Sequence, residues 1–163
     1  MHKIDKTDRL IVNLLMEDGR MPCSELARRL GKTTGRSIRY RLDRLRNEGY
    51  IKIAAVTNPL AMGFPVITDV FIEVEPGMIH EVAQKLVKFE NITYVACSTG
   101  DRDISVQVVA RSNQDAYAFV TEVIAKVSGV RKTTSSVVPL ILKDVYDWHI
   151  PTSANLNLSE SKE

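Results

Sequence analysis

Residues 24–46 read SELARRLGKTTGRSIRYRLDRLR, and this stretch decides the fold of the N-terminal third of the chain. Its apolar residues recur at helical spacing on both sides of a short glycine-containing turn, which predicts two amphipathic helices in close succession. Eight basic residues and one acid lie between Arg28 and Arg46. A compact helix pair whose second helix is basic has the shape and the charge that the major groove of DNA accepts.

Charge is divided unevenly along the chain. Residues 1–52 hold 13 Lys and Arg against 7 Asp and Glu, a net charge of +6, whereas residues 53–163 hold 9 against 13, a net charge of −4. Attraction to phosphates explains the basic part, because basic side chains neutralise a nucleic-acid backbone. The acidic remainder therefore needs a different role.

The composition is that of a globular protein, since the 163 residues are 44% hydrophobic and can form one domain or two small ones. No apolar run approaches the roughly 18 residues of a membrane span, and residues 1–5 contain no signal-peptide core. We therefore expect a cytoplasmic protein without a membrane partner. Cys23 and Cys97 are far apart and in no paired motif, which favours two reduced thiols.

Little in the sequence supports catalysis. The three histidines, His2, His80 and His149, are scattered, and no pair has the spacing of metal ligands. The sequence also has no phosphate-cradling glycine loop and no nucleophile elbow. We therefore expect no catalytic residues, no metal site and no cofactor.

Three helices are predicted in residues 1–52. Their expected bounds are Asp5 or Thr7 to Gly19, residues 22–24 to Gly31, and Thr33 or Thr34 to Asn47. One apolar face of the third helix packs inward, and the residues opposite it are predicted to point away. These outward residues are Arg36, Tyr40, Asp43 and Arg44. A short strand is expected over residues 51–56, before a linker that contains two prolines and a glycine.

A second pattern begins at Ile67. Strand-like alternation and helical spacing follow each other in the order β-α-β-β-α-β, the ferredoxin-like arrangement. The expected strands cover residues 67–75, 92–97, 104–110 and 130–144, and the expected helices cover residues 78–88 and 112–127. Two helices then cover one face of an antiparallel sheet, and its open apolar face invites a partner.

The order of these motifs resembles the Lrp/AsnC family of regulators, also called feast/famine regulatory proteins. The resemblance spans residues 4–145 and is carried by Ile4-Asp5…Asp8…Ile11, Asp18-Gly19-Arg20, Glu25-Leu26-Ala27, Arg39-Tyr40-Arg41-Leu42…Leu45…Glu48-Gly49-Tyr50-Ile51, Asn58-Pro59…Gly63 and Thr99-Gly100-Asp101-Arg102-Asp103. Two departures matter. The turn over residues 32–35 is one residue longer than usual, and Arg102 stands where the family more often has an aromatic or apolar residue.

The resemblance implies an α+β fold, with an N-terminal winged helix-turn-helix followed by a ferredoxin-like β-α-β-β-α-β domain for ligand binding and dimerisation. We expect a DNA-binding domain (residues 1–52), a linker strand and hinge (53–65), an effector-binding and oligomerisation domain (66–150) and a disordered tail (151–163). The implied partners are double-stranded DNA, a small-molecule effector that is usually an amino acid, and further copies of the chain, as a homodimer that can assemble into an octamer.

Recognition helices read base edges with their N-terminal residues, and guanidinium groups suit guanine and phosphate. The DNA-contacting candidates are Arg28, Arg29, Thr33, Thr34, Arg36, Ser37, Arg39, Tyr40 and Arg44. The alternative is an ordinary solvated charged helix face. Arg41 lies at the edge of the apolar face, so a structural ion pair remains open for it.

The loop after the second expected strand is the effector-binding candidate, with Thr99, Gly100, Asp101 and Asp103. Glycine lets a ligand approach the backbone, and a carboxylate can accept hydrogen bonds from an α-ammonium group. The alternative from the residues alone is a plain hairpin turn. The resemblance adds Thr134 and Ser136 on the last strand.

The favoured interpretation is a sequence-specific DNA-binding transcriptional regulator modulated by an amino acid or a related metabolite at a subunit interface. An alternative is a sirohaem-decarboxylase-like enzyme on the same fold, although the second domain is net acidic, with His80 on an expected helix, and an anionic tetrapyrrole prefers a basic cavity. A third interpretation is a metabolite sensor whose basic part binds a protein.

Overall fold

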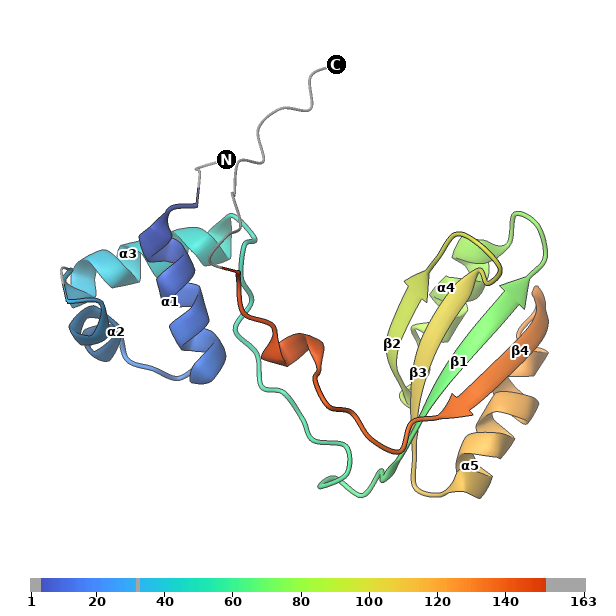
Figure 1. Ribbon diagram of the computed structural model, residues 1–163. Helices are drawn as coiled ribbons and strands as arrows, with labels where there is room; N and C mark the ends of the chain where they lie inside the picture. The colour runs from blue at the N-terminus through green and yellow to red at the C-terminus, as the bar shows by residue number, and fades with distance from the viewer. Residues whose placement is uncertain (1–3, 32, 152–163) are drawn as a thin grey trace, which may run out of the picture. The chain divides into compact units, whose positions relative to one another are not determined.

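The computed structural model describes residues 4–31 and 33–151. The described residues form two compact units, residues 4–56 without residue 32 together with 143–151, and residues 57–142 (Figure 1). Residues 143–151 therefore cluster with the N-terminal unit, whereas the sequence-based division assigned nearly all of them to the second domain. The rest of the expected tail, residues 152–163, lies outside the described residues.

Three helices form the N-terminal unit: α1 (Lys6–Glu17), α2 (Cys23–Leu30) and α3 (Gly35–Asn47). A capping box begins α1, because the Asp5 carboxylate accepts from the Asp8 N–H and the Asp8 carboxylate accepts from the Asp5 N–H. Gly31 ends α2 with a φ of 73°, and Thr34 Oγ1 caps α3 by accepting from the Ser37 N–H. The three predicted helices are confirmed with small shifts at their ends.

A small apolar cluster holds these helices together, with Ile11, Met21, Leu26 and Ile38 buried at its centre. The segment that follows α3 differs from the prediction. No strand forms in residues 48–65, so the predicted strand over 51–56 is wrong. A strand needs a partner for its backbone groups, and the described residues offer none there, while Ile53 and Val56 remain exposed.

The C-terminal unit is a four-stranded antiparallel sheet with helices on one face (Figure 1). Its elements are β1 (Val66–Val74), α4 (Ile79–Leu86), β2 (Ile92–Cys97), β3 (Ile104–Ala110), α5 (Asn113–Ala118), which continues as η1 (Phe119–Val123) and η2 (Ile124–Lys126), and β4 (Val130–Val137). The strand order is β2-β3-β1-β4. The predicted β-α-β-β-α-β order is confirmed.

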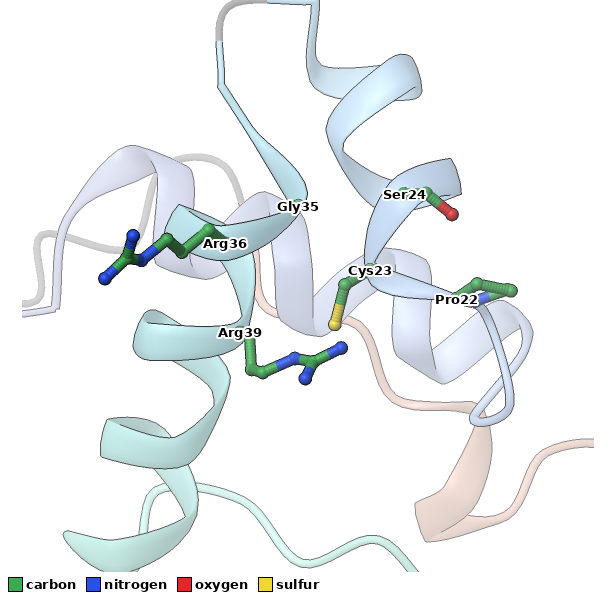
Figure 2. Close-up of a pocket in the computed structure, with 6 residues that line it drawn as sticks. All are labelled: Pro22, Cys23, Ser24, Gly35, Arg36 and Arg39. Carbon is green, nitrogen blue, oxygen red and sulfur yellow. The ribbon is translucent and has the colours of Figure 1, made fainter.

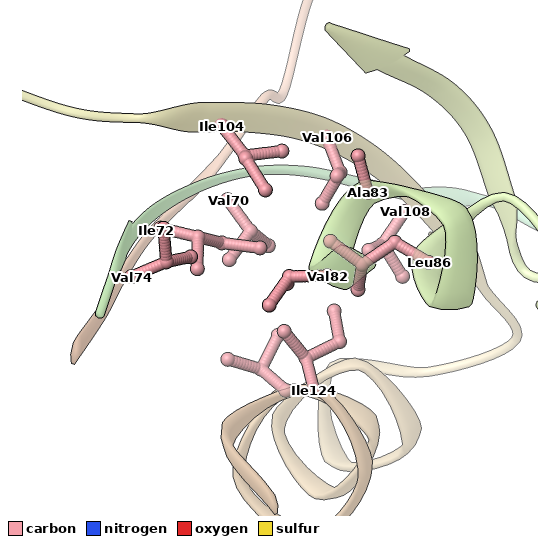
Figure 3. Close-up of a cluster of buried hydrophobic side chains, with 11 residues drawn as sticks. Val70, Ile72, Val74, Val82, Ala83, Leu86, Ile104, Val106, Val108 and Ile124 are labelled. Atoms are coloured by element: carbon pink, nitrogen blue, oxygen red, sulfur yellow. The ribbon is translucent and has the colours of Figure 1, made fainter. Parts of the chain in front are cut away.

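The core of this unit lies between the sheet and its helices (Figure 3). Its buried residues are Val70, Ile72 and Val74 of β1, Val82, Ala83 and Leu86 of α4, Ile104, Val106 and Val108 of β3, and Val120 and Ile124 after α5. Gly129 leads into β4 with a φ of 98°, and a Cβ there would lie 2.9 Å from Val82 Cγ2. Both the backbone conformation and the close packing therefore require glycine.

The face of the sheet opposite the helices is mixed, not apolar as expected. Gln107 Nε2 donates to Asp69 Oδ1 at 3.2 Å, and Lys132 Nζ donates to Glu73 Oε1 at 3.0 Å. The apolar residues on this face are Ile67, Phe71, Tyr94, Ala96 and Val109. Alternation along β1 and β3 sends most of their polar residues to this side, because the helices require apolar residues on the other.

The chain leaves the sheet earlier than predicted, since β4 ends at Val137 and Pro139 has no N–H with which to continue the ladder. Residues 143–151, here called the C-terminal arm, belong to the N-terminal unit. The arm contains a short capped turn, η3 (Val145–Asp147), and its end is bound to α1. The Ile150 N–H donates to Asn13 Oδ1 at 3.0 Å, and Asn13 Nδ2 donates to the Ile150 carbonyl at 3.3 Å.

Candidate functional site

The N-terminal end of α3, where it meets the start of α2, is the first candidate site. A pocket there is lined by Pro22, Cys23 and Ser24 and by Gly35, Arg36 and Arg39. The Arg39 side chain extends toward Cys23, and the Arg36 side chain points away from the pocket (Figure 2). A Cβ on Gly35 would lie 3.6 Å from the Ser24 nitrogen, so the two helices approach closely. The start of α3 therefore packs against the start of α2.

The side chains along the first turns of α3 are exposed. Arg36, Ser37 and Arg39 are open to solvent, and Tyr40 is 73% exposed. Neither Arg36 nor Arg39 forms an ion pair with an acid in the described part of the chain. Two guanidinium groups and a phenol are therefore available to an external polyanion.

Arg44 does not point away from the helices, so that prediction is wrong. Its side chain is 16% exposed and its guanidinium group forms an ion pair with Asp8, whose side chain is fully buried. Helical spacing placed Arg44 opposite the apolar face of α3, but α1 packs beside α3 and brings a carboxylate to it. Arg44 is therefore engaged inside the unit.

Arg41 forms the structural ion pair that the sequence left open. Its Nη1 lies 2.7 Å from Asp5 Oδ2 and 2.8 Å from Asp8 Oδ1. These hydrogen bonds raise the pKa of Arg41. Burial by itself would raise the pKa of Asp5, but hydrogen bonds from the Asp8 N–H and from Arg41 outweigh it, and the pKa is lowered.

Arg28 and Arg29 on α2 are exposed but share an acid. Arg28 holds Glu25 in a bidentate pair at 2.7 and 2.6 Å, and Arg29 Nε donates to the same carboxylate at 3.0 Å. Hydrogen bonds from Arg28 and then Arg29 lower the pKa of Glu25 to about 2. A phosphate would therefore compete with Glu25 for both cations.

The remaining predicted DNA contacts lie in the turn before α3 and in the first turn of α3. Thr34 caps α3, so its hydroxyl oxygen already accepts the Ser37 N–H at 3.2 Å. Thr33 is half-buried, and Lys32 lies outside the described residues. Thr33 in the turn and the exposed Ser37 in the first turn of α3 therefore remain available at the start of that helix.

The loop between β2 and β3 is the second candidate site. The Ser98 N–H donates to the Asp103 carbonyl at 2.8 Å and closes the loop, and Gly100 has a φ of 125° that favours glycine. The exposed candidates are Thr99, Gly100 and Asp101. Asp103 Oδ2 accepts from the Val74 N–H at 2.8 Å, so this carboxylate also holds the end of β1.

Two residues that the sequence did not select, Arg102 and Phe71, join the loop to β1, which is the neighbour of the last strand. The Arg102 guanidinium lies 4.2 Å from the centre of the Phe71 ring, in a cation–π contact. Thr134 is the register partner of Phe71, whereas Ser136 lies opposite Asp69, farther along the strand. An aromatic residue at a polar position of an alternating strand was the signal that could have identified Phe71.

Other chemistry has little support in the described residues. They contain no cluster of three or more His, Cys, Asp or Glu that could hold a metal ion. The half-buried Cys23 and the exposed Cys97 are both free thiols. None of the helices within residues 4–31 and 33–151 is long and apolar enough to cross a membrane.

Two family descriptions match separate parts of the chain. Residues 4–52 match a winged helix-turn-helix DNA-binding domain, and residues 69–146 match the Lrp/AsnC ligand binding domain. Solved structures share the fold. Escherichia coli AsnC has a TM-score of 0.80 at 23% identity, covering 89% of this chain and 99% of its own. A Neisseria meningitidis transcriptional regulator in complex with L-Met has a TM-score of 0.80 at 24% identity, covering 94% and 97%.

Sequence relatives are also regulators. An uncharacterised HTH-type transcriptional regulator of Pyrococcus abyssi is 36% identical over 142 residues, covering 86% of this chain and 89% of its own. The HTH-type transcriptional regulator FL11 of the same organism is 34% identical over 136 residues, covering 83% and 89%. These relatives are not enzymes, so the sirohaem-decarboxylase-like alternative is not favoured. The chain belongs to the Lrp/AsnC family of DNA-binding transcriptional regulators.

Proposed function

We propose that the chain recognises specific sequences of double-stranded DNA in the cytoplasm through the exposed start of α3. Arg36, Arg39 and Tyr40 read the major groove, and Thr33, Thr34 and Ser37 approach the backbone beside them. When DNA binds, Arg28 and Arg29 leave Glu25 and pair with phosphates. These phosphate contacts position the protein but do not specify a sequence. The observation that carries the proposal is that Arg36 and Arg39 are exposed and have no acid partner among the described residues.

A gel-shift titration tests this proposal, with an operator that the purified chain selects from random DNA. Arg36→Ala and Tyr40→Ala should each cost about 1–3 kcal/mol of discrimination between the operator and random DNA, because each removes a base contact. Arg46→Ala is the matched control, since Arg46 is exposed near the other end of α3 and pairs with Asp43 at 4.0 Å. Unchanged discrimination in both test variants would contradict the assignment.

We also propose that an amino acid or a related metabolite regulates the protein by binding at the β2–β3 loop, near a subunit boundary. Asp101 accepts hydrogen bonds from the α-ammonium group, and Gly100 lets the ligand approach the backbone. Thr99, Asp103, Thr134 and Ser136 complete the proposed site. The match to a ligand-binding domain and the L-Met complex of a neighbour with the same fold support the ligand class.

A thermal-shift screen of the twenty amino acids, followed by calorimetry with the best one, tests the site. Asp101→Ala should weaken binding of the amino acid. The affinity of the unliganded protein for DNA should stay nearly unchanged. Glu90→Ala is the matched control, since Glu90 is an exposed acid that precedes β2, while the loop follows it. Equal binding by wild type and Asp101→Ala would place the ligand elsewhere.

We propose that two copies of the chain pair through the open face of the sheet, and that dimers can assemble into octamers. The exposed Tyr94 and the aromatic ring of Phe71 on that face support this idea, because a second copy would cover them. The operator should then be pseudo-palindromic, with half-sites about one helical turn apart or a multiple of it. Light scattering should detect dimers in dilute solution, and a monomer at every concentration would refute the proposal.

A further inference from the structure

A single residue of α1, Asp8, pairs with two of the arginines of α3. Asp8 is fully buried, and its two carboxylate oxygens face different arginines. Asp8 Oδ1 lies 2.8 Å from Arg41 Nη1, and Asp8 Oδ2 accepts from Arg44 Nη2. Arg41 has a second acid, Asp5, at 2.7 Å, whereas Asp8 is the only acid paired with Arg44 among the described residues.

Four arginines of α3 therefore fall into two classes. Arg36 and Arg39 are exposed and have no acid partner in the part of the chain that the structure describes. Arg41 and Arg44 are turned toward α1 and neutralised there. Moving Arg44 into solvent would leave a buried carboxylate with one partner fewer, which opposes that movement.

We propose that Asp8 is a positioning residue that determines how many arginines of α3 reach DNA phosphates. By holding Arg44 inside the N-terminal unit, Asp8 lowers the affinity for DNA of any sequence and leaves the exposed start of α3 to discriminate between sequences. The inference rests on the proposed DNA binding by α3. It predicts that variants of these arginines differ in the salt dependence of DNA binding. Each neutralised phosphate steepens the fall of the logarithm of the binding constant with the logarithm of salt concentration by about 0.9.

The experiment uses the full-length chain and a random-sequence duplex, titrated at several salt concentrations. A random-sequence duplex does not offer Arg36 its cognate base, so its exposed guanidinium group is expected to contact phosphate there. Arg36→Gln should therefore reduce the slope by about 0.9 per bound chain, and Arg44→Gln should leave it unchanged. Both substitutions remove one charge from the same helix, so they form a matched pair. Equal slope reductions in the two variants would overturn the proposal, because Arg44 would then contact phosphate.

Asp8→Asn tests the proposal in the opposite direction. It keeps the size of the side chain but removes the charge that holds Arg44, so the slope should steepen by about 0.9 per chain. Adding Arg44→Gln to Asp8→Asn should return the slope to that of wild type. A folded Asp8→Asn variant with an unchanged slope would overturn the proposal, whereas a purely structural role would lower the melting temperature alone.

The double variant also decides the question if either single variant fails to fold, as judged by circular dichroism. It replaces a buried ion pair by two amides, and its slope should equal that of wild type; a reduction of about 0.9 would overturn the proposal. The proposed function fails in a different way. In that case the wild-type chain does not bind DNA, or Arg36→Gln discriminates between the operator and random DNA as well as wild type does.

Discussion

The two units of this protein are stabilised by different kinds of interaction. Among the described residues, the C-terminal unit buries eleven apolar side chains in one cluster, while the corresponding cluster of the N-terminal unit has four. The N-terminal unit adds a buried carboxylate, Asp8, that pairs with arginines of another helix. A small unit buries a smaller share of its surface, so single polar interactions matter more in it. Its basic residues therefore serve its internal structure as well as an external partner.

The largest expected effect comes from removing the buried charge of the N-terminal unit. Asp8→Ala should lower the free energy of unfolding by about 3–5 kcal/mol, because it breaks the buried ion pairs with Arg41 and Arg44 and half of the capping box of α1. Asp43→Ala is the control, since Asp43 is an exposed acid on α3. Urea denaturation, monitored by circular dichroism, measures the free energy of unfolding of both variants. Similar losses in the two variants would show that the buried ion pair stabilises the unit no more than an exposed acid does.

Truncating a buried apolar side chain should destabilise the C-terminal unit. The loss of unfolding free energy should be similar to that of Asp8→Ala or somewhat smaller. Leu86→Ala removes a fully buried side chain from the cluster between the sheet and its helices. It should lower the free energy of unfolding by about 2–5 kcal/mol. Val87→Ala, one residue along at an exposed position, should cost far less. Hydrogen exchange should show faster opening confined to residues 57–142 in Leu86→Ala. Opening that spreads equally into α1–α3 would contradict the separation of the two units.

A smaller effect links the stability of the N-terminal unit to pH through Asp5. The pKa of Asp5 lies below its ordinary value of 3.8 in the folded chain. Its contribution to stability is therefore complete above the unfolded value and is lost as the pH falls through the folded one. The stability difference between wild type and Asp5→Asn should stay constant down to about pH 5 and shrink below about pH 4. Urea denaturation at several pH values measures it, and a difference independent of pH would contradict the assignment.

The smallest expected effect concerns an imperfection in the C-terminal unit. Thr68 is buried on β1, and its hydroxyl oxygen has no hydrogen-bond partner among the described residues. Thr68→Val keeps the shape and removes the unpaired group, so stability should stay equal or rise by up to about 1 kcal/mol. The reverse change at a neighbouring core position, Val70→Thr, should destabilise the protein. A clear loss of stability in Thr68→Val would mean that the hydroxyl has a partner.

The sequence predicted most of the fold because local signals marked it. Capping residues and glycines marked the ends of α1–α3, and strict alternation marked β1 and β3. The errors occurred where a neighbour decides the outcome. Residues 51–56 have strand composition but no partner strand in the described chain, and β4 stops before Pro139. The end of the arm also left no local signal, because the contact between Asn13 and Ile150 spans 137 residues.

By itself, the sequence determined the order of helices and strands, the basic character of α3 and the resemblance to a family, because periodicity and composition act over a few residues. Only the tertiary structure decided which arginines of α3 remain available. Helical spacing places both Arg44 and Arg36 away from the apolar face, yet Arg44 meets Asp8, which lies 36 residues earlier in the chain. A buried carboxylate in a medium of low polarity holds its counter-charge strongly, so the packing of α1 against α3 withdraws Arg44 and leaves Arg36 exposed.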